Sequence, residues 1–223
     1  MNTPPGIETL PNGQWVVAGD THFTVWSKQR GNIITDPHLM AWLKPHLEGV
    51  TTVLDCGANI GDHTRQYLDW GMQVIAIEPN PLPFACLEHN CPEATCLNIA
   101  ASDHNGILRF AQLENVGASR VSDSGMLVVE GRKLDDMGLP DPGFVKLDIE
   151  GFEVFALRGM IEMLKRAKPI LFVEVNHGAL EANGHTPEDI TSLLRDYVGY
   201  RSLKYYPENG EWHWPQFDLI CKP

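Results

Sequence analysis

The chain has 223 residues, is 43% hydrophobic and 21% charged, and carries a formal net charge of −12, a composition typical of one globular domain. An acidic chain is a poor match to the phosphate backbone of nucleic acid, and without a run of about 18 apolar residues it has no predicted membrane span. We therefore expect a protein that acts on small molecules, with neither a nucleic-acid nor a membrane partner.

The cysteines and the first residues bear on the cellular compartment. The chain has five cysteines, an odd number, and residues 1–15 lack the basic start and apolar stretch of a signal peptide. Both features predict reduced thiols and a cytoplasmic protein. Cys86, Cys91, Cys96 and His89 lie close together, but no second pair follows at the spacing of a zinc site, so no metal centre is predicted there.

The first part of the chain predicts an extension to a larger domain. Residues 14–18 and 22–26 are β-rich runs with a glycine-containing turn between them, which predicts a β-hairpin. Asp36, followed by a proline, is typical of a helix start, so a short helix is expected after it. We expect this extension, residues 1–49, to pack against a main domain spanning residues 50–223.

From residue 50 onward, expected strands alternate with expected helices, the pattern of parallel βαβ units covered on both faces. The expected strands are residues 51–55, 73–78, 94–102, 144–149 and 169–175, and the expected helices are residues 61–71, 80–91, 152–167 and 186–197. A terminal β-hairpin around residues 208–211 would add an antiparallel pair. The sequence therefore predicts an α/β fold with a doubly wound, mostly parallel sheet.

A long section, residues 104–142, separates the third and fourth of these strands. It contains two strand-like runs, residues 105–110 and 126–137, with a polar, glycine-containing run at 114–125 between them. Long loops in compact domains are often functional, so residues 114–125 are a candidate substrate loop. Within it, Arg120 either contacts an anionic acceptor or is a solvated loop charge.

The turn "LDCGANIGD" after the first of these strands predicts a cofactor site. Gly57 and Gly61 permit a tight turn and close backbone approach where doubly wound sheets bind ligands. A dinucleotide loop usually reads G-x-G-x-x-G, and Asp55 just before the turn would repel a pyrophosphate. The same carboxylate suits the ammonium of S-adenosylmethionine (SAM). Glu78, about twenty residues further on, has the spacing of a carboxylate that binds ribose hydroxyls.

Several segments together resemble the FkbM family of SAM-dependent methyltransferases. They are "VLDCGANIGDHT", "VIAIEPNP", "LNIAASDHNG", "KLDDM", "FVKLDIEGFEVFALRGM" and "ILFVEV", and they follow the family order across residues 50–176. The resemblance implies a class I methyltransferase fold, with a Rossmann-like, seven-stranded-type sheet. The residues that it implies for SAM binding are Asp55, Gly57, Ala58, Asn59, Gly61, Glu78, Pro79, Ala100, Ala101 and Asp148.

Lys146 and Asp148 interrupt an otherwise apolar central strand, and residues two apart in a strand project to one face. A buried lysine requires a partner, for which Asp148, Glu150, Glu153 and Glu174 are the candidates. The group is either a structural ion-pair network or part of the catalytic machinery. Perturbed pKa values do not distinguish the two, because both arrangements produce them.

Methyl transfer to oxygen requires a base for the acceptor proton. Asp148, at the strand end beside the expected sulfonium position, is the first candidate for this base, and Glu174 is the second. Residues expected to contact the acceptor are Glu150, Glu153, Asn176, His177 and Arg120. Grouped carboxylates can also hold Mg²⁺, but no specific metal motif is present.

These features predict a SAM-dependent O-methyltransferase that acts on a hydroxyl of a sugar or another small metabolite. A nicotinamide-dependent oxidoreductase on a similar sheet and a non-catalytic binding protein with a SAM fold are the alternatives. The acceptor pocket is expected to come from the parts of the chain that least resemble the family, and the sequence does not indicate an oligomeric state.

Overall fold

The main sheet is doubly wound. A computed structural model describes residues 3–33, 35–206 and 215–223, and within them seven strands form one sheet in the order β12-β13-β11-β10-β3-β4-β5. These strands are β3 (Thr52–Cys56), β4 (Gln73–Ile77), β5 (Thr95–Leu97), β10 (Phe144–Leu147), β11 (Ile170–Asn176), β12 (Ser202–Tyr206) and β13 (Gln216–Lys222). Strand β13 pairs antiparallel with β11 and β12, and the other neighbours are parallel. The predicted sheet is confirmed, although the hairpin tip at 208–211 lies outside the described residues.

The strand order reverses between β3 and β10, and this reversal positions the ligand site. From β3 the chain runs outward through β4 and β5, and β10 then lies on the other side of β3. The turns that follow two such strands diverge and leave a crevice at the carboxyl edge of the sheet. Gly57 follows β3 and Asp148 follows β10, so the two predicted motifs meet at this crevice.

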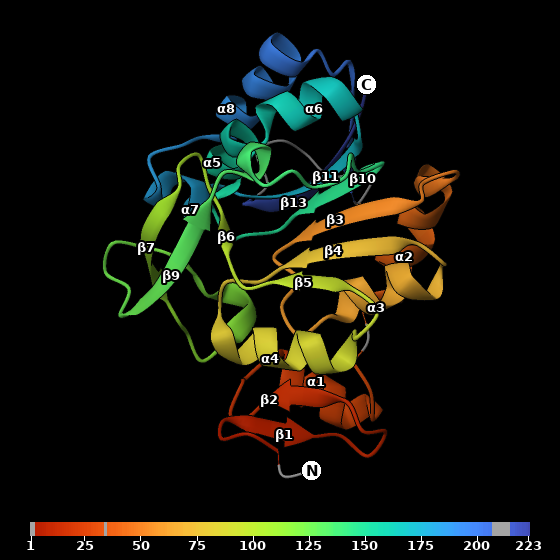
Figure 1. The fold of residues 1–223 in the computed structure, drawn as a ribbon, viewed down its shortest axis with the longest axis vertical. Helices are drawn as coiled ribbons and strands as arrows, with labels where there is room; N and C mark the ends of the chain where they lie inside the picture. The colour runs from red at the N-terminus through yellow and green to blue at the C-terminus, as the bar shows by residue number, and fades with distance from the viewer. Residues whose placement is uncertain (1–2, 34, 207–214) are drawn as a thin grey trace.

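Helices cover both faces of the main sheet (Figure 1). They are α1 (Phe23–Arg30), α2 (Pro37–Leu43), α3 (Asp62–Asp69), α4 (Pro81–Asn90), α5 (Glu153–Gly159), α6 (Ile161–Ala167), α7 (His177–Ala182) and α8 (Pro187–Ser192), with a π-helical turn at Leu193–Val198 and 3₁₀ turns at Lys44–Leu47, Val116–Ala118 and Leu134–Asp136. Val53 and Phe144 face a core with α2, α3 and α4, whereas Leu54 and Val145 face a core with α5, α6 and α8. Within the described part of the chain, no helix is long and apolar enough to span a membrane.

Two expected elements are divided in the structure. The expected helix at 152–167 is interrupted at Met160, whose backbone leaves the helical region at φ −124° and ψ 19°. Met160, the residue between α5 and α6, is fully buried in the core. The expected strand at 94–102 becomes β5 and a separate strand, β6 (Ala100–Ala101), which pairs outside the main sheet.

A smaller sheet stands beside the main one (Figure 1). It contains β6, β7 (Gly106–Ala111), β8 (Arg120–Val121) and β9 (Leu127–Arg132), in the order β6-β9-β7-β8. The strand-like runs at 105–110 and 126–137 therefore do contain strands, and these pair antiparallel. The polar run between them contains a 3₁₀ turn and β8, so it is more ordered than a plain loop.

The N-terminal hairpin uses different strands from those expected. Strand β2 (Trp15–Val17) pairs with β1 (Ile7–Thr9), whereas the expected strand at 22–26 belongs to α1. A contributing contact comes from Asp20, two residues before the N-cap His22, whose carboxylate accepts a hydrogen bond from the Thr24 backbone N–H in the first turn at 2.6 Å. The same carboxylate accepts from the Val116 N–H at 2.9 Å, so it joins α1 to the 3₁₀ turn.

The hairpin packs against α4, as Figure 1 shows, and Asn90 fixes this contact. Asn90 is buried, and its amide exchanges hydrogen bonds with the Trp15 backbone N–H and carbonyl at 2.8 and 2.9 Å. Its Nδ2 also donates to the Ile60 carbonyl at 2.8 Å. One side chain therefore links the hairpin, α4 and the turn after β3. The division at residue 49 remains a prediction.

Asn90→Ala should lower the free energy of unfolding by about 2–3 kcal/mol, because three hydrogen bonds of about 1 kcal/mol each are lost. Asn12→Ala is the matched control, since Asn12 is exposed and bonds only locally to Gln14. The control should change stability by less than about 1 kcal/mol. Urea denaturation followed by circular dichroism measures both, and equal losses in the two variants would contradict the role of Asn90.

Candidate active site

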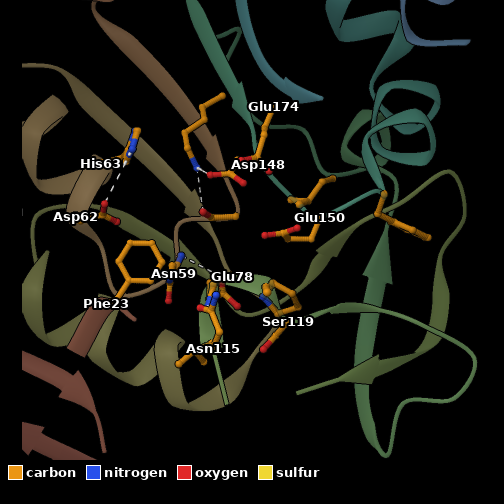
Figure 2. A pocket seen from close by; sticks show the side chains of 18 of the residues that line it. Phe23, Asn59, Asp62, His63, Glu78, Asn115, Ser119, Asp148, Glu150 and Glu174 are labelled. Atoms are coloured by element: carbon orange, nitrogen blue, oxygen red, sulfur yellow. Dashed lines mark hydrogen bonds and ion pairs between the residues drawn. The ribbon is translucent and has the colours of Figure 1, made fainter. Parts of the chain in front are cut away.

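A cavity of about 490 Å³ lies at the crevice between β3 and β10 (Figure 2). It is lined by the turns after these strands, the ends of β4 and β11, the smaller sheet, residues 115–119 and one side of α1. Small-ligand sites usually have volumes of about 300–1,000 Å³, so this cavity can enclose a ligand of cofactor size.

The turn after β3 passes so close to the turn after β10 that only glycine fits at position 57. Gly57 has φ +82°, and a Cβ there would lie 1.8 Å from the carbonyl oxygen of Asp148. The Asp148 backbone N–H also donates to the Cys56 carbonyl at 3.2 Å. The expected close approach at Gly57 is confirmed, and its partner is the second motif of the site.

Lys146 is a buried cation that joins these two turns. Its side chain is 2% exposed, and it lies in register with Asp55 on the adjacent parallel strand. The ammonium donates to the Gly57 carbonyl at 3.0 Å and contacts Asp148 at 3.1 Å and Asp55 at 3.4 Å. Asp55 also accepts a hydrogen bond from the Thr64 hydroxyl at 2.7 Å.

These contacts fix the charges of Lys146 and Asp148. Burial acts to lower the pKa of Lys146, but the carboxylates of Asp148 and Asp55 outweigh it and raise that pKa well above its ordinary value. Burial acts to raise the pKa of Asp148, but the Lys146 ammonium outweighs it and lowers that pKa. Lys146 is therefore a cation and Asp148 an anion at neutral pH.

The position of Asp55 corrects the expectation that its carboxylate meets the ligand. The side chain is completely buried and is directed to Lys146 and Thr64 behind the turn, outside the cavity lining. The reason is the strand alternation, which turns Asp55 toward the face covered by α3. Glu78 and Asp148 do line the cavity, and their carboxylates disfavour a pyrophosphate in the same way.

Glu78 ends β4 and is held by the neighbouring backbone. One carboxylate oxygen accepts from the Asn59 N–H at 2.9 Å and the other from the Asn80 N–H at 2.8 Å. Each oxygen keeps a further acceptor position, so Glu78 can also receive hydroxyl groups from a ligand in the cavity. Burial nevertheless raises the pKa of Glu78 to about 7, against the effect of these two hydrogen bonds.

Three carboxyl groups meet at the other end of the cavity, those of Asp148, Glu150 and Glu174 (Figure 2). Their oxygens lie within 4.8 Å of one another, and one oxygen of Glu174 also accepts from the Gln216 amide at 2.6 Å. Burial, and then the charge of Asp148, raise the pKa of Glu174 well above its ordinary value and that of Glu150 to about 7. Two carboxyls with raised pKa values therefore lie beside an ionised one, an arrangement suited to proton transfer.

The predicted site residues divide by position. Those that line the cavity are Gly57, Asn59, Glu78, Pro79, Ala100, Ala101, Asp148, Glu150, Glu174 and Asn176. Those outside its lining are Asp55, Ala58, Gly61, Glu153, His177 and Arg120. Ala100 and Ala101, which the resemblance implies for SAM binding, thus face the cavity, whereas Ala58 and Gly61 are buried.

The residues predicted to contact the acceptor are only partly brought together. Glu153 is 1% exposed, and its carboxylate accepts from the Ile149 and Gly151 N–H groups, so it caps a turn and does not reach the cavity. His177 begins α7 and lies 5.9 Å from the Phe217 ring. Arg120 donates to the Ala118 carbonyl at 3.4 Å, although its neighbours in the chain line the cavity. None of the three lines the cavity, so their contacts with an acceptor stay predictions.

Several lining residues were not expected from the sequence. Phe23 and Trp26 come from α1, and Figure 2 shows the Phe23 ring beside Asn59. Because the sequence predicts a strand at 22–26, it does not indicate that a helix from this segment lines the cavity. His63 also lines the cavity, and burial lowers its pKa, so its imidazole is neutral. Its position just beyond the glycine turn was the one available signal.

The cavity fits SAM in its donor and acceptor groups. Asn59 Oδ1 is buried and has no hydrogen-bond partner among the described residues, so it can accept from an ammonium or a hydroxyl. Among the described lining residues Lys146 is the only lysine or arginine, and it is already paired. A ligand with hydroxyls and positive charge, and without phosphate, suits this lining.

Comparison with known proteins identifies a family and a relative. The model of the methyltransferase FkbM domain matches residues 55–202. The hexuronic acid methyltransferase AglP of Haloferax volcanii is 31% identical over 152 residues, which are 64% of this chain and 60% of that protein. The chain thus spans less than two thirds of the length of this curated relative.

Solved structures show the same fold. A methyltransferase FkbM from Methylobacillus flagellatus has a TM-score of 0.55 at 19% identity, covering 76% of this chain and 43% of that one. A TehB-like SAM-dependent methyltransferase from Corynebacterium glutamicum has a TM-score of 0.56 at 13% identity, covering 92% and 98%. These similarities confirm the predicted class I methyltransferase fold.

Lys146→Met should lower the free energy of unfolding by about 3–5 kcal/mol at pH 7, because Asp55 is left as a buried charge without its cation. The loss should shrink as the pH falls, since protonation of the freed carboxylates removes the unpaired charge. Lys165→Met, which breaks an exposed pair with Glu162, is the control and should cost less than about 1 kcal/mol. Urea denaturation at pH 5 and 7 measures the stability of both variants. If the stability lost in Lys146→Met were the same at both pH values, Lys146 would not be the partner of buried carboxylates.

Glu78→Gln should flatten the dependence of stability on pH. Between the ordinary value of 4.5 and about 7 the folded chain keeps a proton on Glu78 that the unfolded chain has lost. The contribution of Glu78 to the free energy of unfolding therefore falls as pH rises through this window. The drop in stability from pH 5 to pH 8 should be smaller in the variant by roughly 2 kcal/mol. Urea denaturation tests this, and the exposed control Glu88→Gln should keep the wild-type slope.

Proposed function

The chain belongs to the FkbM methyltransferase family, and on that basis we propose that it transfers the methyl group of SAM to a hydroxyl of a sugar or other small metabolite. The observation that carries the proposal is the cavity at the strand-order reversal, with Glu78 at one end and the ionised Asp148 at the other. A buried carboxylate suited to ribose and a fixed negative charge suited to a sulfonium thus lie in one pocket.

The residues that would hold SAM come from three turns. Glu78 would accept the ribose hydroxyls, while Pro79, Ala100 and Ala101 would border the adenine. The unpartnered oxygen of Asn59 would accept from the ammonium group in place of the buried Asp55. Of the other residues proposed from the resemblance, Ala58 and Gly61 would act only by shaping the turn.

The chemistry that SAM supplies is an electrophilic methyl group on a sulfonium. The residues of the chain must orient the acceptor oxygen in line with that methyl group, exclude water and take the acceptor proton. Asp148, held as an anion by Lys146, would stabilise the positive donor before transfer. The sequence proposed Asp148 or Glu174 as the base for that proton, and both carboxyls line this end of the cavity.

The acceptor would enter where the three carboxyls lie. Asn176 and Glu150 line this end and offer hydrogen-bond acceptors to hydroxyl groups. The name of the relative from Haloferax volcanii indicates a hexuronic acid substrate for that protein, which supports a sugar or sugar acid as the acceptor class here. Arg120 and His177, just outside the lining, would contact only an acceptor that extends beyond the cavity. A Mg²⁺ ion held by the three carboxyls is a separate possibility for the same space.

Isothermal titration calorimetry with S-adenosylhomocysteine and SAM tests the cofactor directly, and we expect both to bind with micromolar affinity. Glu78→Ala should weaken binding about tenfold to a hundredfold, because hydrogen bonds to a charged group contribute about 1.5–3 kcal/mol. Exposed Glu88→Ala is the control. No binding at millimolar ligand, or binding of NADH instead, would overturn the proposal.

Incubation with isotopically labelled SAM and a panel of hexoses and hexuronic acids tests the reaction. Mass spectrometry should find a product heavier by one methyl group on oxygen. SAM binding without transfer to any acceptor would favour the non-catalytic alternative.

A further inference from the structure

Glu150 has an unusual backbone conformation at the cavity. Its φ is +54°, in the left-handed region that non-glycine residues other than asparagine seldom adopt. Among the described non-glycine residues, Asn59 and Lys168 share this property, and Asn59 also lines the cavity. Strained conformations of this kind concentrate at functional sites and persist only where the surroundings hold them.

The turn that carries Glu150 is held from two sides. The buried carboxylate of Glu153 accepts hydrogen bonds from the Ile149 N–H at 3.2 Å and the Gly151 N–H at 3.1 Å. On the other side Gly151 packs so closely that a Cβ there would lie 2.3 Å from the carbonyl oxygen of Ala179. These contacts fix the backbone on either side of Glu150 and direct its side chain to the cavity (Figure 2).

The carboxylate of Glu150 differs from its neighbours in having no donor of its own. Asp148 is bound by the Lys146 ammonium at 3.1 Å, and Glu174 by the Gln216 amide at 2.6 Å. No hydrogen bond to the Glu150 carboxylate occurs among the described residues, although its oxygens lie within 4.8 Å of those of Asp148 and Glu174. The whole Glu150 carboxylate is therefore free to meet a hydroxyl from the cavity, whereas Glu174 keeps only its second oxygen without a partner among the described residues.

The charges that face Glu150 come from four places. Asp148 lies on the same turn and Glu174 on β11, while the cations are Arg120 on β8 and Lys146 on β10. Burial and then the charge of Asp148 raise the pKa of Glu150, and the two cations only partly oppose them, which leaves it at about 7. Together with its free oxygens and its direction toward the cavity, this raised pKa suits Glu150 to accept a proton from a hydroxyl.

We propose that Glu150 is the general base of the transfer, a catalytic role that rests on the proposed function. The acceptor O–H gives its proton to the Glu150 carboxylate while the oxygen forms a bond to the methyl carbon. The carbon–sulfur bond breaks, and its electron pair stays on sulfur, which leaves as the neutral thioether of S-adenosylhomocysteine. Asp148 and Glu174 then act by charge and position, without accepting the proton.

Glu150→Gln keeps the size of the side chain and removes the base. We expect kcat with SAM and the sugar panel to fall about a hundredfold or more, while the affinity for S-adenosylhomocysteine changes less than about twofold. The acid limb of the pH–rate profile, with its midpoint near 7 in the wild type, should disappear in this variant. Glu181→Gln, an exposed position on α7, is the matched control and should leave the profile unchanged.

Two further readouts do not depend on turnover. In the complex with S-adenosylhomocysteine, a ¹³C NMR titration should show a glutamate carboxyl resonance with a midpoint of about 7 that is absent from Glu150→Gln. Glu150→Gly relieves the left-handed backbone, so it should be at least as thermally stable as the wild type while lacking the reaction. A less stable glycine variant would contradict the strained geometry.

The outcomes separate the two proposals. An active wild type together with an undiminished Glu150→Gln variant overturns the role of Glu150 alone. Wild-type turnover that is abolished by EDTA and restored by Mg²⁺ also overturns it, because the three carboxyls would then be metal ligands. A wild type that binds S-adenosylhomocysteine and methylates no acceptor overturns the O-methyltransferase proposal, and the role of Glu150 with it.

Discussion

The buried ammonium of Lys146 is the interaction on which the rest of the site depends. It lies between the carboxylates of Asp55, on β3, and Asp148, directly after β10. It also binds the carbonyl of Gly57 in the glycine turn. Without a cation at this point, Asp55 and Asp148 would be two negative charges at the crossing of the two turns. Because Asp148 stays ionised beside Lys146, its charge in turn raises the proton affinity of Glu150. One cation therefore links the geometry of the cofactor turn to the acid–base state of the acceptor end.

Most of the architecture follows from local patterns in the sequence. The alternation of apolar strands with helices predicts the parallel sheet, because each βαβ unit is determined within a few dozen residues. Gly57 and Glu78 are recognisable for similar reasons, since each follows a buried strand directly and the ends of adjacent strands meet at one edge. Gly57, Asn59, Glu78 and Pro79 on these turns do line the cavity, whereas the predicted Ala58 and Gly61 are buried outside its lining.

The parts that the sequence does not reveal depend on pairing between distant segments. Asp55 looks like a ligand contact until the register of β3 with β10 sets it opposite Lys146. The β-rich composition of residues 22–26 favours a strand, whereas in the structure Phe23 packs on the hairpin core and Asp20 binds a free N–H of the first helical turn. The acceptor end is hardest to predict, because the orientation of Glu150 comes from a turn held by Glu153 and not from a recognisable spacing.

The two hydrogen bonds of the Asp20 carboxylate have a consequence for the wall of the cavity. They join α1, which precedes the family-matched residues 55–202, to the turn at Val116 within them, and both segments line the cavity. Most of the lining thus comes from the matched residues, whereas α1 contributes part of the wall from outside that range. Loss of the Asp20 carboxylate would therefore loosen two segments of the cavity wall at once, although Asp20 itself lies outside the lining.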